Sequence, residues 1–323
     1  MMNTIVPLPS LSQKLKWEGP FASERCAMKP YLTPEEQADL VVKRGLAVDN
    51  LDACLEFFRT NNYYRFSGYA RYFQVAPERG DDTFRTGVSF SAICRVYDDD
   101  ARLRALLLAR LTEIELLLRT VLARVLARDY EAYRRYLDSD FYGSSGDHVR
   151  LACTRDIDRS RDRHILKYVE QGAGQEDGLQ SLPIWSAVEA FSFGTLSKVI
   201  ELGDSGELAR KVAQELGVAK AGFAYRIRAL VYLRNRCAHH SRLWHHSVID
   251  AGPTPNNVRV KAKRLVGQFE PRSVADVIAS LDDLYVRAGL GQPLMPEVFK
   301  LFSHSSHTWK GYTTPVSPRD HRP

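Results

Sequence analysis

A long stripe of apolar residues in the first half of the chain constrains the fold class more than any other feature. Between Phe90 and Asp129, apolar side chains recur at three- and four-residue spacing: Leu103, Leu107, Ile114, Leu117, Leu118, Val121, Leu122 and Val125. This is the spacing of one helix face, so we expect a long amphipathic helix, broken near Asp98–Asp100, with its arginines on the opposite face. Charged residues interrupt the stripe throughout, which excludes the roughly 20 apolar residues of a membrane span.

Capping signals and further periodicity predict helices along most of the remaining chain. Thr33, Pro34 and Glu36 form the pattern of a capping box with proline at the first helical position. Asp49 is positioned to cap a second helix. Further helices are expected over 184–193, 195–202, 220–239 and 273–288. The best strand candidate is Asn257–Val266. The predicted fold is therefore mainly α, with at most a short β piece.

The two ends of the chain have a different composition from its middle. Residues 1–28 read as an extended N-terminal arm. Residues 291–323 are rich in Pro, Ser and His and predict a poorly packed C-terminal tail. The helical domain is then expected over residues 29–290.

Cysteine usage and charge limit the functional classes. The five cysteines are scattered without a C-x-x-C pair, which favours a reducing, cytoplasmic setting over a disulfide framework. The formal net charge is +6. Lysines and arginines far outnumber acids between Ala219 and Arg272, where Asp250 and Glu270 are the only acids. A local basic excess of this kind is typical of a polyanion-binding surface such as one for RNA, although a solvated face would look the same.

The segment Arg234–His246 gathers the side chains best suited to chemistry, including four of the nine histidines. Histidine can transfer protons near neutral pH, and arginine supplies fixed positive charge for a phosphate. Arg234 continues the apolar stripe of the preceding predicted helix, three residues after Val231. A guanidinium there must pair with a carboxylate or line a cleft. The pairing alternative has three candidate partners: Glu113, Glu115 and Glu189.

Four strings of residues in this chain resemble the Abi family (the Abi_2, abortive-infection D/F-like, proteins). Arg234-Asn-Arg-Cys-Ala-His-His-Ser-Arg-Leu-Trp244 is similar to the C-terminal signature of that family and contains an R-x(4–6)-H motif of the HEPN ribonuclease type. The other strings are Lys29-Pro-Tyr-Leu-Thr-Pro-Glu-Glu-Gln, Tyr63-Tyr-Arg-Phe-Ser-Gly-Tyr69 and residues 183–198, PIWSAVEAFSFGTLSK. They occur in family order over roughly residues 29–290, and they imply a HEPN-like helical bundle over about 90–290.

The resemblance implies a phage-defence toxin that cleaves RNA without a metal or other cofactor. His239, or His240 at the alternative spacing, would move a proton. Arg234 would stabilise charge on the phosphate, and Asn235 would position either group. On an ideal helix, residues 234 and 239 point about 140° apart, so one copy does not easily converge on one phosphate. HEPN enzymes pair two motifs across a two-fold axis, and we therefore expect a homodimer, with an RNA or protein restraining element as a further partner.

Other readings of the same residues remain open. Cys237 with His239, His240, His245 or His246 could hold zinc, and Cys237 could serve as a nucleophile beside a histidine, but neither has the usual spacing. Arg236, Arg242, Arg65 and Arg71 are candidate RNA contacts, and the aromatic residues around Arg65 could stack on bases or simply form core. The main rival function is a non-catalytic HEPN-like module that binds RNA or protein in a defence or toxin–antitoxin system.

Overall fold

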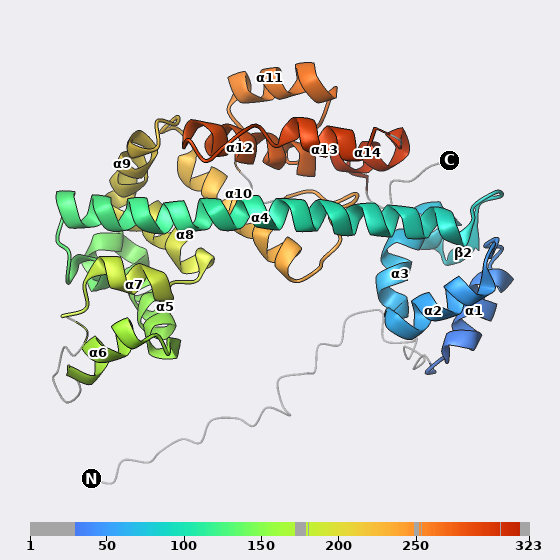
Figure 1. Cartoon of the computed structure of the whole chain (residues 1–323), viewed down its shortest axis with the longest axis horizontal. Coiled ribbons are helices and arrows are strands. Elements are labelled where there is room, and N and C mark those ends of the chain that lie inside the picture. The colour runs from blue at the N-terminus through green and yellow to red at the C-terminus, as the bar shows by residue number, and fades with distance from the viewer. Residues whose placement is uncertain are drawn as a thin grey trace, which may run out of the picture.

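The computed structural model describes residues 30–171, 179, 181–248, 252, 254–303 and 305–316. The predicted arm over residues 1–28 lies outside these ranges. The fold is mainly α, and one helix, α4 (Phe90–Asp129), runs the length of the molecule (Figure 1). Its 40 residues correspond to about 60 Å at 1.5 Å per residue. None of the described helices is both long enough and apolar enough to cross a membrane.

Helix α4 differs from the sequence prediction in two ways. It is not broken near Asp98–Asp100, and Asp99 and Asp100 are buried within it. Two of its arginines, Arg104 and Arg119, are also buried rather than on an exposed face. Each arginine pairs with a carboxylate one turn earlier, Asp100 and Glu115 respectively. Because these pairs offset charge burial locally, the helix can be enclosed by other elements along much of its length.

The N-terminal elements pack at one end of α4 (Figure 1). They are α1 (Pro34–Lys43), α2 (Leu51–Thr60), α3 (Tyr63–Ala70) and a small antiparallel hairpin of β1 (Gln74–Ala76) and β2 (Asp81–Phe84). The predicted capping box of α1 is confirmed, with Thr33 and Glu36 exchanging hydrogen bonds of 2.8 and 3.2 Å. Asn50 rather than Asp49 caps α2. Phe66, Tyr69 and Tyr72 are buried, so these aromatic residues of the segment form core.

The opposite end of α4 carries α5 (Gly146–Arg159), α6 (Arg163–Gln171), α7 (Ile184–Ala190), α8 (Phe193–Leu202) and α9 (Glu207–Glu215) (Figure 1). Helix α10 (Phe223–Ala238) packs against α4, α8 and α12 (Val274–Arg287). The predicted helices over 220–239 and 273–288 correspond to α10 and α12.

The predicted strand at Asn257–Val266 is wrong, because these residues lie in helix α11 (Asn256–Val266). The alternation of valine with Arg or Lys at its start imitates a strand. Val258 and Val266 are both buried, and partly buried Ala262 lies midway between them at helical spacing. The short β piece is instead the hairpin that precedes α4.

The C-terminal segment also differs from the poorly packed tail that its composition predicts. Helices α13 (Met295–Leu301) and α14 (Ser306–Thr313) bury Val298 and Tyr312 completely. Gly311 allows α14 to approach Trp244 closely, since a Cβ there would lie 2.1 Å from the indole nitrogen. A few large apolar residues are enough to pack a short helix against the core. The high content of Pro, Ser and His in this segment does not reveal those few residues.

Candidate functional site

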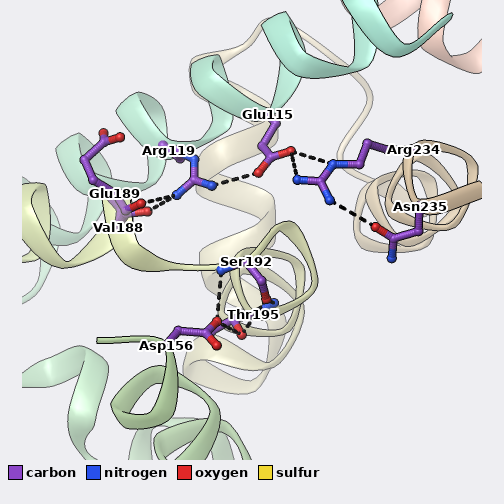
Figure 2. Close-up of polar contacts among 9 residues, drawn as sticks. All are labelled: Glu115, Arg119, Asp156, Val188, Glu189, Ser192, Thr195, Arg234 and Asn235. Carbon is purple, nitrogen blue, oxygen red and sulfur yellow. Dashed lines mark hydrogen bonds and ion pairs between the residues drawn. The ribbon is translucent and has the colours of Figure 1, made fainter. Parts of the chain in front are cut away.

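Arg234 lies in the last turns of α10 and reaches across to α4. Its Nε and Nη2 donate to Oε2 of Glu115 at 3.0 and 2.8 Å (Figure 2). The Glu115 side chain is only 7% exposed, whereas that of Arg234 is 30% exposed. Of the three carboxylates considered from the sequence, Glu115 is therefore the one that pairs with Arg234.

Arg119 occupies the other oxygen of Glu115. Its Nη2 donates to Oε1 at 2.7 Å, and its Nη1 donates to the carbonyl oxygens of Val188 and Glu189 at the end of α7 (Figure 2). One buried carboxylate thus bridges two guanidinium groups, and the trio keeps a net positive charge. Sequence reasoning did not identify Arg119, although its four-residue spacing from Glu115 was available as a signal.

Arg234 keeps hydrogen-bonding capacity after pairing with Glu115. A guanidinium has five N–H donors. Two point to Glu115 and one, on Nη1, donates to Oδ1 of Asn235 at 3.2 Å. The remaining N–H donors belong to a partly exposed side chain and have no acceptor among the described residues.

The connection between α7 and α8 places an aromatic ring beside Arg234. Oδ2 of Asp156 accepts from Ser192 N at 2.9 Å and from Thr195 Oγ1 at 2.6 Å (Figure 2). Ser192 itself caps α8. This arrangement holds Phe193, the first residue of α8, with its ring centroid 5.9 Å from the Arg234 guanidinium carbon. Cation–π contact at this distance adds to the fixation of Arg234.

Helix α10 ends at the two candidate histidines. His239 is the C-cap residue, and His240 follows in the left-handed region at φ 53°. The amide of His240 donates to Cys237 O at 3.1 Å and that of Ser241 to Arg236 O at 2.8 Å, which is the pattern of a Schellman motif. Glycine usually occupies the position of His240. Both histidine side chains are exposed at this helix end.

The loop after the motif is fixed by Asp100 of α4, which is fully buried. Asp100 accepts from the amides of Leu243 and Trp244 at 3.1 and 3.0 Å and from Arg104. Two hydroxyl groups complete the cluster, Tyr69 from α3 at 2.5 Å and Tyr312 from α14 at 2.8 Å. The histidine-bearing end of α10 is therefore held from three separate parts of the chain.

A family model described as Abi-like protein matches residues 56–245, more than half of the chain. The chain belongs to this family. No curated protein and no solved structure matches it.

The Abi-like match contains all the polar contacts around Arg234. Its range includes Glu115 and Arg119 on α4, the α7–α8 connection and the whole of α10, and it ends directly after Trp244. Tyr312, by contrast, lies beyond the matched residues although it binds Asp100. The Abi-like region thus carries the candidate site, and the C-terminal helix of this chain adds a support outside it.

The other predicted RNA contacts divide into two groups. Arg65 donates to the carbonyl oxygen of His240 at 2.6 Å, and Arg242 donates to that of Trp244 at 2.5 Å. Arg236 donates to the carbonyl oxygen of Arg242. These three arginines therefore border the end of α10. Arg71, the residue that directly follows α3, is exposed and lines the cavity on the other side of that helix.

The alternative chemistries of the motif find little support in the geometry. Cys237 is buried, and burial raises the pKa of its thiol to about 12, so it is a poor nucleophile. Burial lowers the pKa of His246 to about 4, and Arg236 and Arg242 add to that shift. Across the described ranges, no three Cys, His or acidic residues are grouped as metal ligands would be.

Part of the basic excess in residues 219–272 is offset within the fold. Arg226 pairs with Asp283, Arg228 with Glu201 and Arg259 with Asp276, in addition to the Arg234–Glu115 pair. All four acids lie outside the basic segment. The net charge of residues 219–272 therefore overstates the positive charge available on this surface to bind an RNA backbone.

Proposed function

We propose that this Abi-like protein is a phage-defence toxin that acts as a metal-independent, HEPN-type endoribonuclease. The observation that carries the proposal is the arrangement at the end of α10. Arg234 is fixed by Glu115 but keeps N–H donors with no acceptor in the described part of the chain, and exposed histidines follow where the helix stops. A held cation beside proton-transferring groups is what cleavage of a phosphodiester requires.

The reaction needs only groups of the RNA and of the site. The 2′-oxygen attacks the adjacent phosphorus and gives up its proton, while the bond from phosphorus to the 5′-oxygen breaks and that oxygen gains a proton. The products are a cyclic phosphate and a 5′-hydroxyl. We assign proton transfer to His239, with His240 as the alternative, and charge stabilisation to Arg234. Asn235, which accepts from Arg234, orients that guanidinium.

We further propose that two copies combine to form the site. Arg234 lies within α10 and His239 is the C-cap residue directly after Ala238, so we expect the divergence of about 140° between the two side-chain directions to hold. Arg234 of one copy and His239 of another can then face the same phosphate. Mixing inactive Arg234→Ala protein with inactive His239→Ala protein should restore part of the cleavage, because mixed dimers contain one intact composite site. Absence of any restoration, with dimers present, contradicts this arrangement.

The proposed activity is tested by separating binding from cleavage. His239→Ala should abolish cleavage of RNA while leaving RNA affinity nearly unchanged, because the exposed imidazole contributes to the reaction and little to holding the strand. Exposed His148 on α5 provides a matched control, and His148→Ala should cleave like the wild type. If the wild-type protein binds RNA and never cuts it, the endoribonuclease proposal fails.

The Arg234–Glu115 pair specifically favours a second candidate, a non-catalytic HEPN-like module that binds RNA or protein. In that case Arg234 serves the fold alone. Arg234→Ala would then lower the stability of the fold, and any RNA-dependent activity would fall only as far as the folded fraction of the protein falls. A specific loss of cleavage in a fully folded Arg234→Ala protein rejects this candidate.

A further inference from the structure

A second site-like feature lies next to the motif, on the far side of α3. A cavity of about 1020 Å³ opens between α1, α2, α3 and the β1–β2 hairpin. Its walls combine tyrosine rings, arginines and amide side chains, among them Tyr31, Tyr63, Tyr64, Arg71, Gln37 and Gln74. We call this cavity the α3 groove. Aromatic rings alternating with cations are typical of surfaces that hold single-stranded nucleic acid.

Two buried amide oxygens in the wall of the α3 groove have no hydrogen-bond partner among the described residues. Gln74 is 5% exposed, and its Nε2 donates to the carbonyl oxygen of Asp82 at 2.9 Å, but its Oε1 accepts nothing. Gln37 repeats the pattern, with Nε2 donating to Leu32 O at 2.8 Å and a buried, unpaired Oε1. Both oxygens are closed to solvent, so a base in the groove could reach either one only after the surrounding side chains move.

Tyr64 and Arg71 provide the stacking surface and the positive charge. The Tyr64 side chain is 67% exposed, and Arg71 is exposed without an acidic partner in the described part of the chain. The other two arginines of the groove are engaged, Arg44 with Asp82 at 2.8 Å and Arg59 with Glu35 at 3.2 Å. Arg71 is thus the cation best placed to meet a phosphate.

Helix α3 forms a shared wall between the groove and the catalytic candidates. Tyr64, Ser67 and Arg71 follow helical spacing along the groove side. Arg65 and Gly68, one residue further on, face the motif loop. Arg65 binds the carbonyl oxygen of His240, and a Cβ on Gly68 would lie 4.0 Å from Nε of Arg242. A strand held in the groove therefore needs to pass over only one helix, roughly 10–12 Å across, to reach His239 and His240.

We propose that the α3 groove binds a single-stranded segment of the RNA substrate next to the cleaved bond. Bases stack on the exposed ring of Tyr64, and Arg71 contacts the phosphate chain. The proposal rests on the proposed function for the nature of the ligand. It adds that the bound RNA is single-stranded and that the strand lies in the α3 groove.

The test uses full-length protein carrying His239→Ala and an unstructured RNA oligonucleotide containing 5-iodouridine. Tyr64→Ala and Arg71→Ala should each weaken binding by about tenfold, in line with the loss of one stacked base or one charged contact. Tyr133→Ala and Arg150→Ala are the matched controls and should bind normally, because Tyr133 follows the C-terminal end of α4 at Asp129, Arg150 lies in α5, and both side chains are exposed. Photocrosslinks should map to Tyr64 or Tyr31.

The outcomes separate this inference from the cleavage proposal. Loss of binding and crosslinking with Tyr64→Ala supports the groove even if the wild-type protein never cuts RNA. If the wild type cuts RNA and the Tyr64→Ala and Arg71→Ala proteins bind and cut equally well, the groove proposal falls while the ribonuclease stands. An α3 groove that instead holds a peptide would give that second result.

Discussion

Helix α4 carries two buried carboxylate–arginine pairs of identical spacing, and they differ in what remains available to a ligand. Asp100 pairs with Arg104, and Glu115 with Arg119. Asp100 is fully buried and meets five donors, all from the protein itself. Glu115 instead binds Arg234, which is 30% exposed and keeps N–H donors that have no acceptor among the described residues. The same pairing of a carboxylate with an arginine four residues later thus forms a fully buried cluster at Asp100, and at Glu115 it holds a partly exposed arginine, Arg234.

The largest effect on stability is expected from the closed pair. Asp100→Asn leaves Arg104 buried beside a neutral amide, and it weakens the contacts that hold the motif loop and α14. Losing one partner of a buried ion pair costs about 3–5 kcal/mol. Urea unfolding should show that loss. A change below about 1 kcal/mol would mean that the Asp100 cluster is not the support described above.

The open pair should affect activity more than stability. Arg234→Ala should lower RNA cleavage by roughly 10²–10³-fold, the effect of removing one donor to a developing anion. Glu115 keeps its contact with Arg119, so the loss of unfolding free energy should be only about 1–3 kcal/mol. Cleavage rates and free energies of unfolding in urea, measured on the Arg234→Ala and Asp100→Asn proteins, allow the two pairs to be compared. An Arg234→Ala protein that is as unstable as Asp100→Asn would remove the distinction between the two pairs.

His246, in the loop held by Asp100, should make part of the stability depend on pH. Its pKa is about 4 in the folded protein, below the ordinary value of 6.5, because burial disfavours the charged ring. Because this folded-state pKa lies below the value of 6.5 expected for the unfolded chain, the unfolded chain takes up a proton first as the pH falls. The contribution of neutral His246 to stability is therefore full above pH 6.5 and is lost as the pH falls from about 6.5 to about 4. His246→Asn should flatten that part of the stability profile. An unchanged profile would show that His246 is not enclosed as described.

The smallest expected effect concerns the left-handed residue at the end of α10. His240→Gly should stabilise the fold by about 0.5–1 kcal/mol, because glycine adopts φ 53° without steric cost. Thermal unfolding measures the gain. The same variant distinguishes the two histidines, since cleavage persists if His239 moves the proton and disappears if His240 does. A destabilised His240→Gly protein would show that the imidazole has a packing role instead.

Sequence reasoning predicted those features that depend on neighbouring residues. The capping box at Thr33, the apolar stripe of α4 and the end of α10 near His239 all follow from local signals, and all are present. Glu115 was identified as one of three partners for Arg234, because a guanidinium on an apolar stripe needs a carboxylate. Local spacing could also have revealed the Arg119–Glu115 and Arg104–Asp100 pairs, which lie one helical turn apart.

The remaining features depend on contacts between distant parts of the chain. Tyr312 and Asp100 are 212 positions apart in the sequence, and no sequence pattern around either residue predicts their hydrogen bond. The packing of α14 against Trp244 likewise rests on the absence of a side chain at Gly311. In α11, local alternation even gave the wrong element, because the faces of a helix are decided by what it packs against.

The most direct test of the account is to incubate total RNA in EDTA with wild-type protein and with the Arg234→Ala/His239→Ala double variant, and to map the new RNA ends. We expect cleavage by the wild type alone, unaffected by the chelator, with cyclic phosphate and 5′-hydroxyl ends. Cleavage that requires a metal ion, or equal cleavage by the double variant, would contradict the assignment of the site to Arg234 and His239.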